Sequence, residues 1–159
     1  MVTPAALDEL AALLGPERAR ADADTLALYA SDETPRACPP AAVLFPTSHD
    51  DVVGIVRLAN AHGFALIPRG AGSGNVGGAL PVPGSVVVSF ECMQQILEFD
   101  PANRLVRVQP GVVTDEIDRL AATAGLMYAP DPGSGAYCRI GGNLDERRRA
   151  ALREIWRHT

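Results

Sequence analysis

The apolar positions of the first 63 residues predict two helices separated by an extended connector. Leucines recur at helical spacing between Thr3-Pro4 and Gly15. A Thr cap, a Pro in the first turn and a Gly at the end are helix start and stop signals. A second amphipathic run begins after Ser48 and stops at Gly63. The prolines between the runs favour extended chain: Pro35, Pro39 and Pro40. We expect the first helix to be a leader packed on the main body.

The second helix lies between two short apolar runs that predict strands. Residues 42–45 precede it and residues 65–67 follow it. A strand, a helix and a strand in this order form a βαβ unit, which implies parallel strands with a right-handed crossover. Further along are the β-branched run Val86–Val88, a strand at Leu105–Val108, and a helix that Thr114 caps and that ends near Ala124. The pattern predicts an α/β fold class.

Composition and charge narrow the function classes. The chain has 159 residues, 47% of them hydrophobic, which is enough for a buried core, and 15 Gly with 13 Pro indicate many shaped loops. A net charge of −5 argues against nucleic acid or an anionic membrane as the main partner. The chain start lacks the features of a signal peptide, and no run approaches the roughly 20 apolar residues of a membrane span. We expect a cytoplasmic protein.

The cysteines and histidines do not form a pattern of catalysis or metal binding. Cys38, Cys92 and Cys138 are odd in number and far apart, unlike a zinc site or a disulfide framework. We expect all three to be small buried or half-buried residues. His49 and His62 flank the second helix and are expected to be solvated or capping groups. We therefore predict neither catalytic residues nor a metal site.

A glycine-rich run follows the second predicted strand and is the main candidate for ligand binding. Five of the fifteen glycines lie within residues 70–78, here called the glycine loop. Glycine permits a positive φ and close approach of the backbone, so that successive N–H groups can converge on one anion. A pyrophosphate would suit such a loop, and Ser73 adds a hydroxyl donor. The alternative is a flexible surface loop, although the run follows a buried strand directly and carries few charges.

The segment Gly72-Ser73-Gly74-Asn75-Val76-Gly77 also matches the GxGxxG dinucleotide fingerprint. That fingerprint requires the loop to open into a helix whose N-terminus holds the phosphates. Pro81, Pro83 and Gly84 follow instead, and then a β-branched strand. We therefore predict that loop amides alone would hold the phosphates.

Six ordered blocks between about residues 40 and 143 resemble the FAD-linked oxidases, with an FAD-binding domain of the p-cresol methylhydroxylase type. Within that family they are most similar to the glycolate oxidase flavoprotein subunit and to D-lactate dehydrogenase. The blocks are Pro68–Pro81, Glu91–Ile96, Phe99-Asp100, Val108–Gly111, Ala129–Ser134 and Ile140–Asn143.

The resemblance implies an FAD site. The glycine loop has neither the His nor the Cys through which some members attach the flavin, so the FAD is expected to be non-covalent. Two groups of residues are implied in binding it. The pyrophosphate group is Pro68, Arg69, Gly70, Ala71, Gly72, Ser73, Gly74, Gly77 and Gly78. The group beside the ribityl chain and the flavin is Pro130, Asp131, Ser134, Ile140, Gly141, Gly142 and Asn143.

Several of these residues also have a simpler interpretation. Arg69 could form a surface salt bridge, Asp131 could form a turn between prolines, and Asn143 could serve a left-handed φ. Two positions depart from the family pattern. Ser73 stands where the family usually has Thr, and Arg139 replaces a small hydroxyl residue, which puts a long cation close to the implied cofactor wall.

The resemblance further implies the parent activity, oxidation of a D-2-hydroxy acid such as glycolate or D-lactate to the 2-oxo acid. Electrons would pass from FAD to a partner, which could be an electron-transfer subunit, or to a quinone. The family's base and substrate-binding cations lie beyond this chain, so we expect the chain alone to be inactive and to hold at most the ADP-like half of FAD. The alternative is a non-catalytic nucleotide-binding or interaction module that docks through the basic residues 147–158.

The sequence suggests three segments. Residues 1–38 are expected to be a helical leader and connector, residues 39–146 a partial FAD-binding domain, and residues 147–159 a non-native tail. Read one nucleotide later with suitable codons, the tail can encode the Ala-Gly-Gly and Lys-Tyr-Gly pattern with which the family continues. We therefore hypothesise a frameshift, a net loss of two nucleotides just after Glu146.

Overall fold

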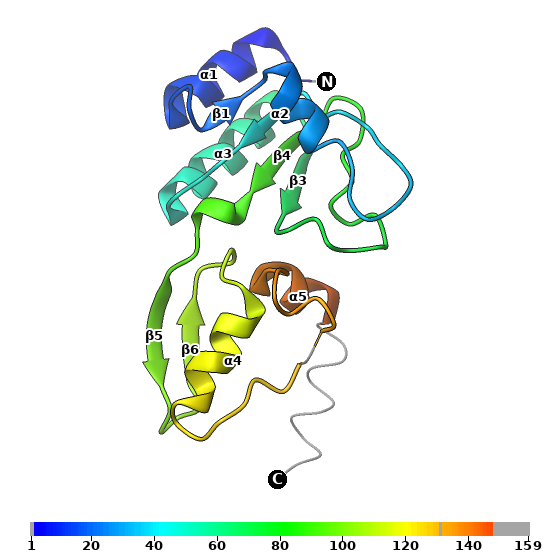
Figure 1. Ribbon diagram of the computed structural model, residues 1–159. Helices are drawn as coiled ribbons and strands as arrows, with labels where there is room; N and C mark the ends of the chain where they lie inside the picture. The colour runs from blue at the N-terminus through cyan, green and yellow to red at the C-terminus, as the bar shows by residue number, and fades with distance from the viewer. Residues whose placement is uncertain (1, 131, 148–159) are drawn as a thin grey trace. The chain divides into compact units, whose positions relative to one another are not determined.

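The computed structural model describes residues 2–130 and 132–147, which form two compact units, Met1–Cys92 and Met93–Thr159 (Figure 1). The division between these units falls between Cys92 and Met93, and the segment boundaries expected near residues 38 and 146 stay predictions. The tail beyond Arg147, and with it the frameshift hypothesis, lies outside the described residues.

The first unit is built on a sheet with the strand order β1-β2-β4-β3. The strands are β1 (Ala19–Arg20), β2 (Ala42–Leu44), β3 (Leu66–Arg69) and β4 (Val86–Ser89). Both β2 and β3 are parallel to β4, and β1 is antiparallel to β2. The predicted βαβ unit is therefore present, but β4 lies between its two strands. All four residues of β4 are buried, as expected for a strand covered on both faces.

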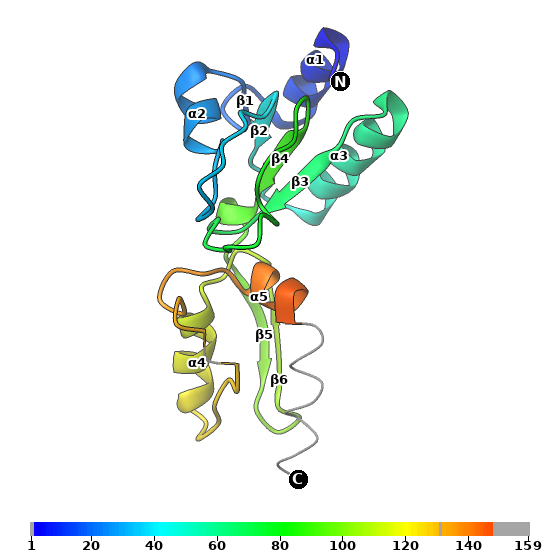
Figure 2. The ribbon, with the colours of Figure 1, turned by 90° about the vertical axis from the view of Figure 1, so that its right-hand side faces the viewer.

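Helices cover both faces of this sheet. Helices α1 (Pro4–Leu14) and α3 (His49–His62) pack on one face, against the side chains of Val86 and Val88. On the other face Val87 packs with Tyr29, the residue that ends α2 (Ala23–Leu28). Figure 2 shows α2 on one side of the strands and α3 on the other. Successive side chains of a strand point to opposite faces of the sheet. The continuous apolar run Val86–Val88 therefore contributes to two separate hydrophobic cores, one on each face.

The predicted start and stop signals of α1 and α3 are confirmed. The hydroxyl of Thr3 accepts a hydrogen bond from the amide of Ala6, and α1 ends at Gly15 with φ 85°. The hydroxyl of Ser48 accepts from the Asp51 amide at 3.1 Å, and α3 ends at Gly63 with φ 69°. Helix α2 was not predicted, because its six residues are too few to establish an apolar period.

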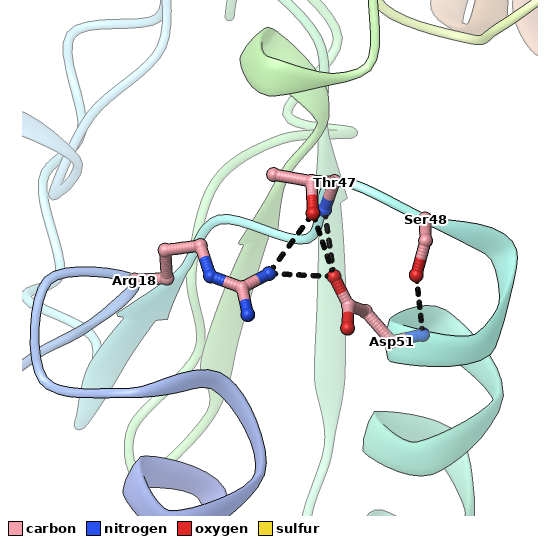
Figure 3. A network of polar contacts seen from close by, with 4 residues as sticks. All are labelled: Arg18, Thr47, Ser48 and Asp51. Carbon is pink, nitrogen blue, oxygen red and sulfur yellow. Dashed lines mark hydrogen bonds and ion pairs between the residues drawn. The ribbon is translucent and has the colours of Figure 1, made fainter.

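A polar network joins the turn after α1 to the start of α3 (Figure 3). Arg18 Nη1 lies 2.7 Å from Asp51 Oδ2 and donates to Thr47 Oγ1 at 3.0 Å. The same carboxylate oxygen accepts from the Thr47 amide at 2.9 Å. The carboxylate is therefore satisfied by side-chain and backbone donors, and it lies in the first turn of α3, where the helix dipole also favours negative charge.

Within residues 93–130 and 132–147, the second unit contains an antiparallel pair of strands and two α-helices. Strand β5 (Ile96–Asp100) pairs with β6 (Leu105–Val108), and the helices are α4 (Thr114–Ala122) and α5 (Ile140–Arg147). A one-turn helix, η1 (Phe90–Cys92), ends the first unit. The small core of the second unit is formed by Val112, Ile117 and Ile140, with Val106 and Val108 from β6 packed against it.

In the second unit one sequence expectation is wrong and one helix was missed. The N-cap of α4 is Val113, without a side-chain hydrogen bond, and the Thr114 hydroxyl points instead to buried partners. Helix α5 was not predicted, because Gly141-Gly142 in its first turn have low helix propensity.

The cysteine expectation holds in part. Cys38 is half-buried and Cys138 is buried, but Cys92 is exposed, contrary to prediction. Among the described residues, no helix has the length and apolar character needed to cross a membrane.

Candidate functional site

The glycine loop leads from the end of β3 to β4, and no helix lies between these strands. The prediction that GxGxxG is not a strand-to-helix fingerprint here is therefore confirmed. Pro81 is buried where the chain returns toward β4, and the Ser85 hydroxyl accepts a hydrogen bond from the amide of Val82 at 3.1 Å. These contacts fix the far end of the loop, so any phosphate held here must bind to loop atoms.

Two glycines of the loop take conformations that other residues rarely adopt. Gly72 has φ 71° and Gly77 has φ 81°. Apart from the adjacent residues of the chain, no atom of the described residues lies within 4 Å of the place where a Cβ would stand at Gly77 or Gly78. The loop is therefore shaped by positive φ at two points and leaves open space beside the second of them.

The loop leaves its own hydrogen-bond donors unused. Within residues 2–130 and 132–147, no amide N–H group of residues 71–78 donates to a protein acceptor. The Ser73 hydroxyl likewise has no partner among the described residues, and Ser73 is only half-buried. A run of accessible, unsatisfied amides is the arrangement in which backbone donors bind an anion. The donors present thus fit a diphosphate group.

Arg69, the last residue of β3, turns its side chain toward a segment much earlier in the chain. Its Nη1 atom donates to the carbonyl oxygen of Ser31 at 2.6 Å, and its Cζ atom lies 5.2 Å from the centre of the Tyr29 ring. A Cβ on Gly72 would collide with the Arg69 guanidinium. Among the described residues no carboxylate lies within ion-pair distance of Arg69, so the salt-bridge interpretation has no partner there.

The residues around Arg69 keep it half-buried and keep Tyr29 neutral. Burial lowers the pKa of the Arg69 guanidinium, against the opposing charges of nearby acidic groups, but a guanidinium remains protonated at neutral pH. The Tyr29 hydroxyl donates to Glu91 Oε2 at 2.6 Å. Burial and this hydrogen bond raise the pKa of Tyr29 to about 12. A cation on a neutral aromatic ring therefore lies next to the glycine loop. Sequence reasoning missed Tyr29 and Ser31, because no motif links them to Arg69.

The residues implied beside the ribityl chain and the flavin belong to the second unit. Pro130 is half-buried, and Asp131 lies outside the described residues. Ser134 begins a turn in which its carbonyl oxygen accepts from the amides of Tyr137 and Cys138, at 3.0 and 2.8 Å. Ser134 therefore contributes to the shape of the segment that leads to α5.

The Ile140–Asn143 segment is the first turn of α5. Ile140 is buried in the core, and Gly141 donates its amide to Pro110 O at 3.0 Å. Asn143 is 9% exposed and its side-chain amide donates to Thr114 Oγ1 at 2.5 Å. Among the described non-glycine residues only Arg104 has a positive φ, so the left-handed interpretation of Asn143 is wrong. Gly142 is exposed and presents open space.

Arg139 is held by the chain before α4. Its Nη1 atom donates to Gly111 O at 3.1 Å, and its backbone pairs with Val113 in an isolated antiparallel bridge. Its Nε atom is buried and has no partner among the described residues. The long side chain therefore packs along residues 111–113 of its own unit.

The candidate residues of the first unit are thus a glycine loop with free amide donors, and those of the second unit are the glycine-containing start of α5. Among the described residues, no group of three His, Cys, Asp or Glu side chains could hold a metal ion. Loop amides, a serine hydroxyl and a nearby guanidinium can bind and orient a phosphorylated ligand. They do not include a base placed for proton transfer.

Comparison with known proteins identifies the family. The family model described as FAD binding domain matches residues 40–157, a range that includes most of the expected tail. The D-2-hydroxyglutarate dehydrogenase of Stutzerimonas stutzeri (strain A1501) is 44% identical over 145 residues, 91% of this chain and 31% of that protein. The glycolate oxidase subunit GlcD of Bacillus subtilis (strain 168) is 36% identical over 92% of this chain and 31% of that protein.

Solved structures agree with the fold class. A crystal structure of p-cresol methylhydroxylase with substrate bound matches with a TM-score of 0.76 and 26% identity, covering 91% of this chain and 30% of that one. The predicted α/β fold and the p-cresol methylhydroxylase type of FAD-binding domain are thus confirmed, and this chain spans 31% of the length of both relatives named above. The chain belongs to the family of FAD-binding domains found in FAD-linked oxidoreductases.

Proposed function

We propose that the glycine loop holds the diphosphate of a non-covalently bound FAD. The observation that carries this proposal is the set of amides at residues 71–78, which have no protein acceptor among the described residues. Ser73 would add a hydroxyl donor. The open space at Gly77 and Gly78 would admit the phosphate oxygens. The nominated residues Pro68–Gly74 would form the near wall of this site.

The second part of the proposal concerns residues 130–143. Following the family resemblance, Pro130, Asp131, Ser134 and Ile140–Asn143 would lie beside the ribityl chain and the flavin. The exposed Gly142 and the half-buried Ser134 and Gly141 suit close approach of a ligand to the backbone. The buried Ile140 and Asn143 would instead hold that backbone in place.

The activity of the whole protein is a further proposal. The relatives are named for D-2-hydroxyglutarate, glycolate and D-lactate, all 2-hydroxy acids. Bound FAD would supply the acceptor of a hydride equivalent from such an acid. We propose that the parent enzyme oxidises a D-2-hydroxy acid to the 2-oxo acid in the cytoplasm and passes electrons to a separate acceptor, such as an electron-transfer subunit.

Calorimetric titration of the 159-residue chain tests the diphosphate site. ADP and FAD should bind with similar affinity, and AMP at least tenfold more weakly, because the loop amides would recognise two phosphates. Gly72→Val and Gly74→Val should abolish binding. A β-branched side chain disfavours the positive φ of Gly72, and at either position it blocks the approach of the phosphates. Val76→Ala is the control, because it trims a side chain that is 77% exposed and keeps the amide. Unchanged affinity in both glycine variants would place the phosphates elsewhere.

The substrate class is tested on the longest open reading frame that contains these residues. The purified product should carry FAD, and anaerobic addition of D-2-hydroxyglutarate, D-lactate or glycolate should bleach the oxidised flavin spectrum. The L-enantiomers of 2-hydroxyglutarate and lactate should react much more slowly, whereas glycolate is achiral and tests only the 2-hydroxy acid class. Failure of all three acids to reduce the flavin would refute the proposed substrate class. It would not contradict the proposed diphosphate site.

A further inference from the structure

The glycine loop is connected to residues 29–32, here called the anchor segment, through the side chain of Arg69. Arg69 Nη1 donates to Ser31 O at 2.6 Å across a separation of 38 residues. The guanidinium also lies on the Tyr29 ring, at 5.2 Å from its centre, a cation–π distance. The position of Arg69 is therefore fixed by one hydrogen bond and by one flat surface.

The same guanidinium fills the space beside Gly72. A Cβ at Gly72 would collide with the Nη2, Cζ and Nε atoms of Arg69. Gly72 also has φ 71°, and it lies near the start of the loop. The first turn of the loop is thus packed against a planar group that the anchor segment holds.

The anchor segment is itself held firmly. The Tyr29 hydroxyl donates to Glu91 Oε2 at 2.6 Å, and that oxygen also accepts from Ser89 Oγ at 3.2 Å. The Tyr29 ring meets Phe45 edge to face, with 5.6 Å between ring centres. Tyr29 is 7% exposed. The surface beneath Arg69 is therefore rigid compared with an exposed loop.

We propose that Arg69 is a positioning residue that orders the glycine loop before a ligand binds. Its planar guanidinium is held by the anchor segment and packs against Gly72. The amides of residues 71–78 are therefore already arranged for a diphosphate before it binds. This inference rests on the proposed FAD site and specifies which contacts give that site its shape. Preorganisation increases affinity because less conformational entropy is lost on binding.

The variants Arg69→Lys and Arg69→Met distinguish a positioning role of Arg69 from a role that depends only on its positive charge. Lysine keeps the charge but lacks the planar fork that stacks on Tyr29 and donates to Ser31. If Arg69 positions the loop, Arg69→Lys and Arg69→Met should both weaken ADP binding, by about tenfold. In the absence of ligand, both should also lower the ¹⁵N order parameters of residues 71–78. Arg57→Met is the control, because it removes the same positive charge from an exposed residue of α3. It should alter neither the affinity for ADP nor the order parameters of residues 71–78.

A second comparison uses two glycines and leaves Arg69 in place. Gly72→Ala and Gly77→Ala introduce the same strain of a positive φ, but only the first collides with the guanidinium. Gly72→Ala should lower the order parameter of the Arg69 Nε–H group, and Gly77→Ala should leave it unchanged. This measurement decides the question even if the Arg69 variants fail to fold.

The outcomes separate the inference from the proposed function. If Arg69→Lys keeps both the affinity for ADP and the order of the loop, or if Arg69 stays equally ordered in Gly72→Ala, the positioning role is wrong. If the unmodified chain does not bind ADP or FAD, the proposed diphosphate site is wrong. In that case the order parameters still show whether Arg69 orders the loop.

Discussion

The side-chain amide of Asn143 donates to the hydroxyl of Thr114 at 2.5 Å, which joins the first turn of α5 to the first residue of α4. The Asn143 amide nitrogen also lies 3.2 Å from the sulfur of Cys138, and the Thr114 hydroxyl lies 3.3 Å from the same sulfur. All three residues are buried. A helix with two glycines in its first turn is therefore held at its start by a buried polar cluster.

Thr114→Val should destabilise the second unit by about 1–3 kcal/mol, because the Asn143 amide would lose an acceptor in a buried site. Hydrogen exchange of the amides in α4 and α5 measures this as a loss of local unfolding free energy. The matched control is Thr123→Val, since the Thr123 hydroxyl is exposed and donates only to Leu120 O. That change should stay within about 0.5 kcal/mol. Equal effects of the two substitutions would contradict a stabilising role for the cluster.

Gly141→Ala and Gly142→Ala should have opposite effects on α5. A Cβ at Gly141 would stand 2.9 Å from Pro110 Cβ and 3.1 Å from Pro110 O, whereas at Gly142 nothing lies within 4 Å. Alanine at 141 should destabilise the unit by about 1–2 kcal/mol through overpacking. Alanine at 142 should stabilise it by up to about 1 kcal/mol through helix propensity. Chemical denaturation of both variants tests the pair, and a stabilised Gly141→Ala would show that Pro110 can move.

Asp51→Asn should weaken the attachment of α3 to the turn after α1. Burial raises the pKa of Asp51, but hydrogen bonds from Thr47 and Arg18 outweigh it, so the net pKa is lowered from 3.8. The ionised carboxylate therefore stabilises the fold above about pH 3.8, and this stability is lost as the pH falls through the lowered pKa. At neutral pH we expect a loss of about 1–2 kcal/mol, from charge-assisted hydrogen bonds.

Urea denaturation at several pH values checks the Asp51 prediction. The difference between the unmodified chain and Asp51→Asn should shrink below pH 3.8. Asp50→Asn is the control, because Asp50 lies in the same helical turn but is exposed. A difference that stayed constant down to the lowest pH would mean that the Asp51 charge adds no stability.

The raised pKa of Tyr29 predicts that the folded chain loses stability at alkaline pH. The pKa of Tyr29 is raised from 10.0 to about 12 in the folded chain. Stability is therefore fully present below about pH 10 and is lost as the pH rises through about 12, because the unfolded phenol ionises first. Tyr29→Phe should remove most of this dependence, and Tyr137→Phe, at an exposed position, should leave it unchanged. Melting temperatures between pH 9 and 12 provide the measurement, and identical profiles for all three proteins would refute the assignment.

The sequence by itself determined the elements whose signals are local. The cap at Ser48 and the stop at Gly63 specify α3, because both act within one turn of the helix. The apolar run Val86–Val88 specifies a buried strand in the same way. The glycine loop was also recognisable from the sequence, since five glycines within nine positions indicate a backbone conformation or a close approach that other residues do not permit. Six ordered blocks were enough to suggest the family that the comparisons confirm.

The tertiary structure decided what depends on distant residues. Strand β4 lies between β2 and β3 because these strands pair across long connections. Local secondary-structure propensity does not determine such pairing. Arg69 reaches an anchor segment 38 positions earlier, and Asn143 bonds to Thr114 across 29 positions. Sequence reasoning considered a salt bridge for Arg69, for which the described residues offer no carboxylate, and a left-handed φ for Asn143, which was wrong. Hydrogen bonds and packing between such residues form only once the fold brings them together, so no spacing in the sequence records them.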